Sequence, residues 1–215
     1  TLQALEYTLS KTDLTEWYEA RAVPFAPGEV LVVVRDITVQ KLAQLAQRES
    51  ETRYRMLFEQ SPIGLWEEDF SAVRAYLDEL RAGGVTDLAA YFDATPEALW
   101  DCARLVRVLN VNQTTLTLLG LDESHEKPRD LANMFTATTI GNFRDELLAF
   151  ANGATRYGWE QTQLGPAYEA VTAVVAVALA PGHESTWDRV YVTAVDITAR
   201  RQAQEESERL RERVA

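Results

Sequence analysis

The chain has 215 residues, of which 47% are hydrophobic and 25% are charged. This composition is typical of globular proteins and excludes a disordered or collagen-like chain. The formal net charge of −12 repels phosphate backbones, so we expect no nucleic-acid partner. The single cysteine, Cys102, excludes an internal disulfide framework and a cysteine-rich zinc site.

The sequence predicts no direct contact with a membrane. The longest apolar stretch, residues 170–180, is too short to span a bilayer, and no signal peptide opens the chain. A single cysteine also fits a reducing compartment, so we expect a cytoplasmic location. Because the first residue is Thr1 and not methionine, we interpret the chain as a fragment, whose parent can itself be membrane-anchored.

One pattern occurs near the start of the chain and again near its end. Residues 18–38 and residues 168–198 each contain a strand-like run, an Ala-Pro-Gly turn, a second strand-like run and the triplet Asp-Ile-Thr. Runs rich in valine around a Pro-Gly break are typical of hairpins. Each copy therefore predicts a hairpin that leads directly into a polar helix.

The two Asp-Ile-Thr triplets have a physical role in this prediction. Asp36 and Thr38 in the first copy, and Asp196 and Thr198 in the second, can accept hydrogen bonds from the free N–H groups of a first helical turn. The aspartates also complement the positive end of the helix dipole. We expect each triplet to form a rigid corner between a strand and a helix.

Helices are expected after both corners, over residues 39–59 and 199–215. Positions at alternating steps of three and four form a heptad-like seam on the first helix: Leu42, Leu45, Glu49, Thr52 and Met56. Two interpretations remain, a solvated linker helix and a parallel dimeric coiled coil. We favour the coiled coil and expect a homodimer through helices 39–59 and 199–215.

The segment between these helices has an α+β pattern. Strands are predicted at residues 61–69 and 104–111, and Asn112 caps a short helix that Gly120 ends. A longer helix ends at Gly153, and three antiparallel strands begin near residue 155. Residues 71–101 are expected to form a helical, acidic insertion with a solvated surface. Taken in order, these elements form an α+β layout.

Three segments share a family pattern: ETRYRMLFEQSPIGLW at 51–66, NVNQ at 110–113 followed by LLG at 118–120, and VDIT at 195–198. Together they resemble a Per-ARNT-Sim (PAS) sensor module of bacterial signalling proteins. The resemblance implies a five-stranded antiparallel sheet with flanking helices over residues 60–198. Residues 1–38 resemble the last three strands of a preceding module, which alone would expose an apolar face and an open edge, so we expect another copy or the complete module to cover them. The alternative is that the fragment was trimmed and only the linker helix holds this part.

The resemblance also implies a function. PAS modules sit in series before a histidine kinase or a diguanylate cyclase output domain in the same chain, dimerise, and pass conformational change along their connecting helices. Asp36 and Thr38 would then form the input corner, and Asp196 and Thr198 the output corner. We expect a non-catalytic sensory, dimerising and relay module of a sensor histidine kinase. The alternative is a receptor domain for a small molecule that controls a diguanylate cyclase.

A small organic ligand would bind between the concave face of the sheet and the helices. The expected lining is mainly aromatic and consists of Trp66, Leu119, Met134, Phe135, Phe143, Trp159 and Tyr191. Aromatic side chains at such positions more often belong to the hydrophobic core than to a ligand site. Arg156 or Arg189 could supply a cationic contact for a ligand, but the simpler interpretation is that both arginines lie at the surface.

Known cofactors are disfavoured. Haem-binding PAS modules use a histidine on the long helix, and residues 129–150 contain none. Flavin-binding modules use a cysteine within Asn-Cys-Arg, a pattern that Cys102 does not match, so we expect it to be a small buried side chain. His125 and His183 lie in polar turns without further ligands at useful spacing, so we expect no metal site.

We expect no catalytic activity in this chain. The sequence contains no glycine-rich phosphate loop, no nucleophile elbow and no metal-binding helix motif. Glu67 and Glu68 are adjacent on a predicted strand and point to opposite faces, so they cannot act together on one substrate.

Overall fold

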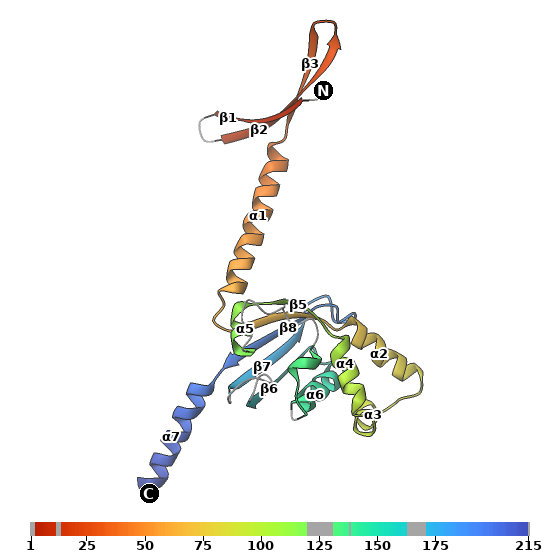
Figure 1. Ribbon diagram of the computed structural model, residues 1–215, viewed down its shortest axis with the longest axis vertical. Coiled ribbons are helices and arrows are strands. Elements are labelled where there is room, and N and C mark those ends of the chain that lie inside the picture. The colour runs from red at the N-terminus through yellow and green to blue at the C-terminus, as the bar shows by residue number, and fades with distance from the viewer. Residues whose placement is uncertain (1–2, 12–13, 120–130, 138, 163–170, 215) are drawn as a thin grey trace. The chain divides into compact units, whose positions relative to one another are not determined.

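The computed structural model describes residues 3–11, 14–119, 131–137, 139–162 and 171–214. The chain divides into two compact units, Thr1–Leu57 and Phe58–Ala215 (Figure 1). The first unit ends within the helix Thr38–Glu59, and the second ends with the helix Thr198–Val214, as the repeated hairpin–helix pattern predicts.

The first unit is a three-stranded antiparallel sheet followed by a long helix. The strands β1 (Gln3–Lys11), β2 (Leu14–Ala26) and β3 (Glu29–Asp36) pair in the order β1-β2-β3. Gly28 forms the turn between β2 and β3 with a φ of 83°, a left-handed conformation that side chains with a Cβ adopt at a cost. Helix α1 (Thr38–Glu59) begins immediately after β3, one residue before the expected start.

The first unit has almost no core of its own. Ile37 is its one buried side chain among those described, and every residue of β3 is exposed, including the apolar run Val30–Val34. The three strands expected over residues 1–38 are present. Their origin in a preceding PAS-like module, and the surface that covers them, remain predictions.

The second unit is an α+β domain built on a five-stranded antiparallel sheet, which confirms the predicted fold class. The strands pair in the order β5-β4-β8-β7-β6: β5 (Arg107–Val111), β4 (Gly64–Asp69), β8 (Val190–Asp196), β7 (Thr172–Leu179) and β6 (Arg156–Thr162). Strand β8 is therefore central, and it leads directly into α7 (Thr198–Val214). Strand β5 is shorter than expected, because Arg104 and Leu105 complete the preceding helix.

Helices flank this sheet. They are α2 (Ser71–Ala82), α3 (Leu88–Ala94), α4 (Glu97–Leu105), α5 (Gln113–Leu119), the short 3₁₀ helix η1 (Ala132–Met134) and α6 (Ile140–Ala151). Helices α4 and α6 lie side by side on one side of the sheet (Figure 1). The segment 71–101 is helical as expected, and Gly83 follows the last residue of α2.

Aromatic side chains hold the sheet and helices together. Phe70, at the end of β4, packs edge-on against Phe143 and Phe150 of α6, with ring centroids 6.1 and 6.5 Å apart. Trp187 contacts Phe150 in the same manner at 5.6 Å. These rings are all buried, so they form the centre of the core.

Asn112 connects the start of the domain to α5. Its Oδ1 accepts hydrogen bonds from the backbone N–H groups of Leu65 and Thr115, both at 2.9 Å, which confirms the predicted helix cap. Its Nδ2 donates to the carbonyl oxygens of Ile63, at 2.9 Å, and Phe58, at 3.0 Å. The side chain is fully buried and well partnered, so it fixes how the chain enters β4.

Candidate functional site

The corner between β8 and α7 is held by three hydrogen bonds. The Thr198 N–H donates to Asp196 Oδ1 at 2.8 Å, so the aspartate caps the first turn of α7 as predicted. The N–H of Thr172, the first residue of β7, donates to Thr198 Oγ1 at 2.9 Å. The Ile197 N–H donates back to the Thr172 carbonyl oxygen at 2.8 Å. Helix α7 is thus tied to two adjacent strands, not to β8 alone.

The first unit contains the same corner with the same partners by position. The Thr38 N–H donates to Asp36 Oδ1 at 2.8 Å, and the Trp17 N–H donates to Thr38 Oγ1 at 2.8 Å. The Ile37 N–H donates to the Trp17 carbonyl oxygen at 2.9 Å. Hydrogen bonds from Thr38 hold the pKa of the Asp36 carboxyl below its ordinary value, so this cap is charged near neutral pH.

The threonines differ in role from the expectation. Asp and Thr were both expected to accept from the first helical turn, but the threonine hydroxyls accept from the N–H groups of a neighbouring strand. Trp17 and Thr172 were missed because each lies far from its partner in the sequence and meets it only through strand register. They are equivalent only through register: each immediately precedes the residue that pairs with the aspartate of its corner, Tyr18 with Asp36 and Ala173 with Asp196.

A cavity of about 50 Å³ lies between the sheet and the helices. Five of the seven predicted pocket residues line it: Trp66, Leu119, Met134, Phe135 and Trp159. The other lining residues are Glu68, Leu131, Glu146, Gln161, Val175, Val177 and Val192.

Two of the predicted pocket residues do not line the cavity. Tyr191 is 41% exposed, because its neighbours Val190 and Val192 point into the core and successive residues of a strand alternate between faces. That expectation was wrong by one residue of register. Phe143 is fully buried and packs against Phe135 with ring centroids 5.1 Å apart, so it supports the cavity wall from outside the lining.

The cavity also contains two buried carboxyl groups that the sequence analysis did not assign to it. Glu68 is 1% exposed, and its Oε1 accepts a hydrogen bond from Trp66 Nε1 at 2.7 Å. Burial raises the pKa of Glu68 to about 8, against the smaller opposing effect of the Trp66 bond. Glu68 could have been found from its spacing, since it lies two residues after Trp66 on one strand.

Glu146 is the second of these groups. It is 3% exposed, and burial followed by the proximity of Glu68 holds its pKa well above the ordinary value. Its Oε1 has no hydrogen-bond partner within the described part of the chain. The residue lies on the apolar face of α6 between Phe143 and Phe150, a helical spacing that places its side chain toward the sheet.

Besides Glu68 and Glu146, the polar side chain described in the cavity wall is the uncharged Gln161. Gln161 Oε1 accepts from Trp159 Nε1 at 2.8 Å and from Asn142 Nδ2 at 3.1 Å. The lining that the structure describes contains no lysine, arginine or histidine. Arg156 is exposed at the start of β6, and Arg189 pairs with Glu67, so neither supplies the cationic contact considered from sequence.

Comparison with known families agrees with this architecture. Residues 86–154 match the family model described as a PAS domain. This part of the second unit is similar to a PAS domain. PAS domains are generally non-catalytic sensory modules, which agrees with the class of function expected from sequence. The match begins within the segment 71–101 and ends before β6.

Several solved structures are similar to this chain at low sequence identity. The PAS domain of an HTR-like protein from Haloarcula marismortui is 19% identical, with a TM-score of 0.43, covering 73% of this chain and 99% of its own. A domain of a sensory box sensor histidine kinase/response regulator from Geobacter sulfurreducens is 15% identical, with a TM-score of 0.42 and coverages of 68% and 94%. The PAS domain of Bordetella pertussis BvgS is 12% identical, with a TM-score of 0.43 and coverages of 76% and 98%. No curated protein matches the chain.

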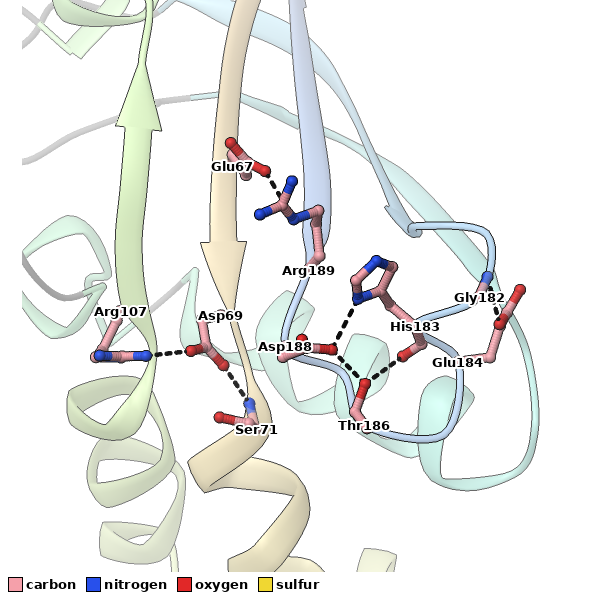
Figure 2. A network of polar contacts seen from close by, with 10 residues as sticks. All are labelled: Glu67, Asp69, Ser71, Arg107, Gly182, His183, Glu184, Thr186, Asp188 and Arg189. Carbon is pink, nitrogen blue, oxygen red and sulfur yellow. Dashed lines mark hydrogen bonds and ion pairs between the residues drawn. The ribbon is translucent and has the colours of Figure 1, made fainter.

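A second polar cluster lies at the far end of β4 in the second unit (Figure 2). Glu67 pairs with Arg189 Nε at 3.1 Å, while the adjacent Glu68 points into the cavity, so the two glutamates occupy opposite faces as predicted. Asp69 pairs with Arg107 and accepts from the Ser71 N–H at 2.8 Å. Burial raises the pKa of Asp69, but the bonds from Ser71 and Arg107 outweigh burial and lower it overall. This cluster joins β4, β5, β8 and α2.

The loop between β7 and β8 forms the rest of this cluster. His183 Nδ1 lies 2.9 Å from Asp188 Oδ1, and the Thr186 hydroxyl donates to the same oxygen (Figure 2). Trp187 has a φ of 56°, a strained value for a bulky residue, and its carbonyl oxygen accepts from the Phe70 N–H at 2.8 Å. We infer that the loop has a structural role and fixes the start of β8 relative to α2.

Other expectations concern single residues and metals. Cys102 is fully buried, and burial raises its pKa to about 12, as expected of an inert core thiol. Among the described residues, no three His, Cys, Asp or Glu side chains gather as metal ligands. His125 lies outside the described residues.

Within the described part of the chain, every helix is too short or too polar to cross a bilayer.

Proposed function

We propose that the PAS domain is a non-catalytic sensory and relay module that passes conformational change through α7 to a histidine kinase output in the same chain, on the cytoplasmic side. A diguanylate cyclase is the alternative output. The observation that carries this proposal is the output corner, in which Thr198 joins the first turn of α7 to β7. The repeat of that corner at Thr38 supports a serial arrangement with an input helix and an output helix.

The sheet offers a direct mechanical route from the cavity to this corner. Cavity residues stand on β4 (Glu68), β7 (Val175) and β8 (Val192), and the last two strands hold the corner. A change in what fills the cavity moves these strands relative to one another. Because α7 is bonded to both β7 and β8, such a shift changes the direction in which the helix leaves the sheet.

Replacement of Thr198 tests this route. We expect Thr198→Val to loosen α7 from β7, because valine keeps the shape of threonine and removes a hydrogen bond worth about 1 kcal/mol. Spin labels at Val174→Cys on β7 and Ala203→Cys on α7 report the separation by pulsed electron paramagnetic resonance. The native thiol does not interfere, since Cys102 is fully buried. The wild-type corner should give one narrow distance distribution, and Thr198→Val a broad one.

The matched control is Thr198→Ser, which keeps the hydroxyl and should retain the narrow distribution. Labelled chains are diluted with unlabelled ones so that only distances within one chain contribute. Equal distributions for the valine and serine variants would contradict the role of this hydrogen bond.

We also propose that the chain forms a homodimer, chiefly through α1. No residue of this helix is buried, and its seam residues Leu42, Leu45 and Met56 are 53%, 48% and 51% exposed. Their heptad spacing favours a second copy of the same helix as the covering partner. Helix α7 exposes Leu210 as its one large apolar side chain among those described, so it contributes less apolar contact.

A charge in this seam should separate the dimer. We expect Leu45→Glu to weaken dimerisation by at least about tenfold, because each copy would bring an unpaired carboxylate into the seam. Light scattering coupled to size-exclusion chromatography measures the mass. Gln47→Glu adds the same charge away from the seam and should leave the dimer intact. A Leu45→Glu protein that stays dimeric would contradict the seam.

A second candidate function is that of a small-molecule receptor. The cavity favours it, because a purely structural core gains nothing from two buried carboxyl groups, one of which has an oxygen without a hydrogen-bond partner among the described residues.

A further inference from the structure

The chemistry of the cavity is unusual for a hydrophobic core. Its walls are apolar and aromatic, yet Glu68 and Glu146 reach into it from β4 and α6, and both are at least 97% buried. Buried carboxyl groups normally pair with a cation or with several hydrogen-bond donors. Glu68 has one donor, the Trp66 indole, and Glu146 Oε1 has none among the described residues.

Among the described residues, this site has no positive charge. Two buried carboxyl groups that sense each other electrostatically cannot both ionise without a counter-charge. The described lining supplies no basic side chain, and the arginines of β5 and β8 bind Asp69 and Glu67 outside it. A ligand that brings its own charge and N–H donors satisfies both carboxyl groups at once.

We propose that this cavity binds a small organic ammonium ion, whose N–H groups donate to Glu146 Oε1 and Glu68 and whose alkyl part packs against Trp66, Trp159 and Phe135. The proposal deepens the receptor role and rests on the sensory function proposed above. Indole rings add to the fit, because their faces attract cations. Anions and neutral ligands of the same size leave the carboxyl groups unpaired.

The size of the cavity limits the ligand. A volume of about 50 Å³ corresponds to only a few water molecules, at about 10–15 Å³ each. A monoalkylammonium ion such as ethylammonium, with three heavy atoms, is of this scale. For so small a ligand we expect a dissociation constant no tighter than about 1 mM, given the ceiling on affinity per heavy atom.

Binding should depend on pH in a defined direction. The groups that face the site are Glu68 on β4 and Glu146 on α6, and the pKa of nearby Tyr157 on β6 is raised by burial and by the charges of Asp145 and Glu146. The cation prefers the ionised carboxyl groups, so binding releases protons. If one proton is released, affinity rises by about tenfold per pH unit from about pH 6 to about pH 8. The ammonium group itself stays charged until about pH 10.

Calorimetric titration of the whole chain with ethylammonium chloride tests the proposal. Ethanol is the neutral control, since it has the same number of heavy atoms and no charge. We expect saturable binding of ethylammonium, affinity that rises with pH, and little binding of ethanol. Glu146→Gln should weaken ethylammonium binding by at least about tenfold, because it removes a charge-assisted hydrogen bond.

Glu67→Gln is the matched control variant. Glu67 is a buried carboxylate on the same strand as Glu68, but it points away from the cavity, so ethylammonium binding should not change. Circular dichroism confirms that each variant is folded. If Glu146→Gln does not fold, the pH series and the ethanol comparison on the wild-type chain decide alone.

Three results would overturn the inference: no saturable ethylammonium binding at any pH, equal affinity for ethanol, or unchanged affinity in folded Glu146→Gln. The relay is measured separately by the spin-label distances. If ethylammonium does not bind but Thr198→Val still broadens the distance distribution, only the ammonium site is refuted. If ethylammonium binds but Thr198→Val leaves the distance distribution unchanged, only the relay is refuted.

Discussion

The free energy of unfolding of the second unit is expected to fall by about 3–5 kcal/mol as the pH rises from about 5 to about 8. The cause is Glu68, whose pKa is raised from 4.5 to about 8 because the side chain is buried. Over this range the folded chain holds a proton that the unfolded chain has already released. A group with a raised carboxyl pKa stabilises the fold fully below its unfolded pKa, and that stabilisation is lost as the pH rises through the folded value. Glu146 acts in the same direction.

Urea unfolding followed by tryptophan fluorescence measures this dependence. Glu68→Gln should flatten the curve, because glutamine carries no proton to lose. Asp69 does not counteract the effect, since its pKa is lowered and it stays ionised across the whole range. Glu67→Gln should leave the slope unchanged. A stability that is constant or rises between about pH 5 and about pH 8 would contradict the burial of an unpaired Glu68.

Asn112→Ala is expected to lower the free energy of unfolding by about 3–5 kcal/mol. Alanine removes the acceptor for the N–H groups of Leu65 and Thr115 and a donor to the Ile63 carbonyl, all at the point where the chain enters β4. Each buried backbone group left unpaired costs about 1–3 kcal/mol. The same unfolding experiment, performed at about pH 6 to keep Glu68 protonated, measures the loss.

Thr117→Ala is the control for this variant. Thr117 lies on the same short helix, is exposed, and donates only to the Gln113 carbonyl within that helix. Its replacement should change the free energy of unfolding by no more than about 0.5 kcal/mol. A loss below about 1 kcal/mol for Asn112→Ala would mean that water or a rearranged chain replaces the bonds of its amide.

Local patterns in the sequence predicted most of the fold. The Asp-Ile-Thr triplets located both corners, Asn112 located the cap of α5, and the valine-rich run before the second Ala-Pro-Gly turn located β7. The five-strand layout followed from the family resemblance. These features depend on hydrogen bonds and periodicities within a few residues, which is why they are visible without coordinates.

The site was less predictable because it depends on how distant elements meet. Tyr191 was assigned to the cavity, but a shift of one residue moves a strand side chain to the other face. Glu146 stands in an apolar helical face, where a carboxyl group is easily taken for an interruption of the pattern. Its significance depends on Glu68, which reaches the same cavity from β4, more than seventy residues earlier in the chain.

The most direct test of the relay is the distance between spin labels at Val174→Cys and Ala203→Cys, measured at about pH 6 and about pH 9, below and above the Glu68 pKa of about 8. We predict that the distance distribution shifts or broadens at the higher pH, and that Glu68→Gln does not show the full change. An identical distribution at both pH values in the wild-type chain would contradict the claim that the state of the cavity is passed to α7.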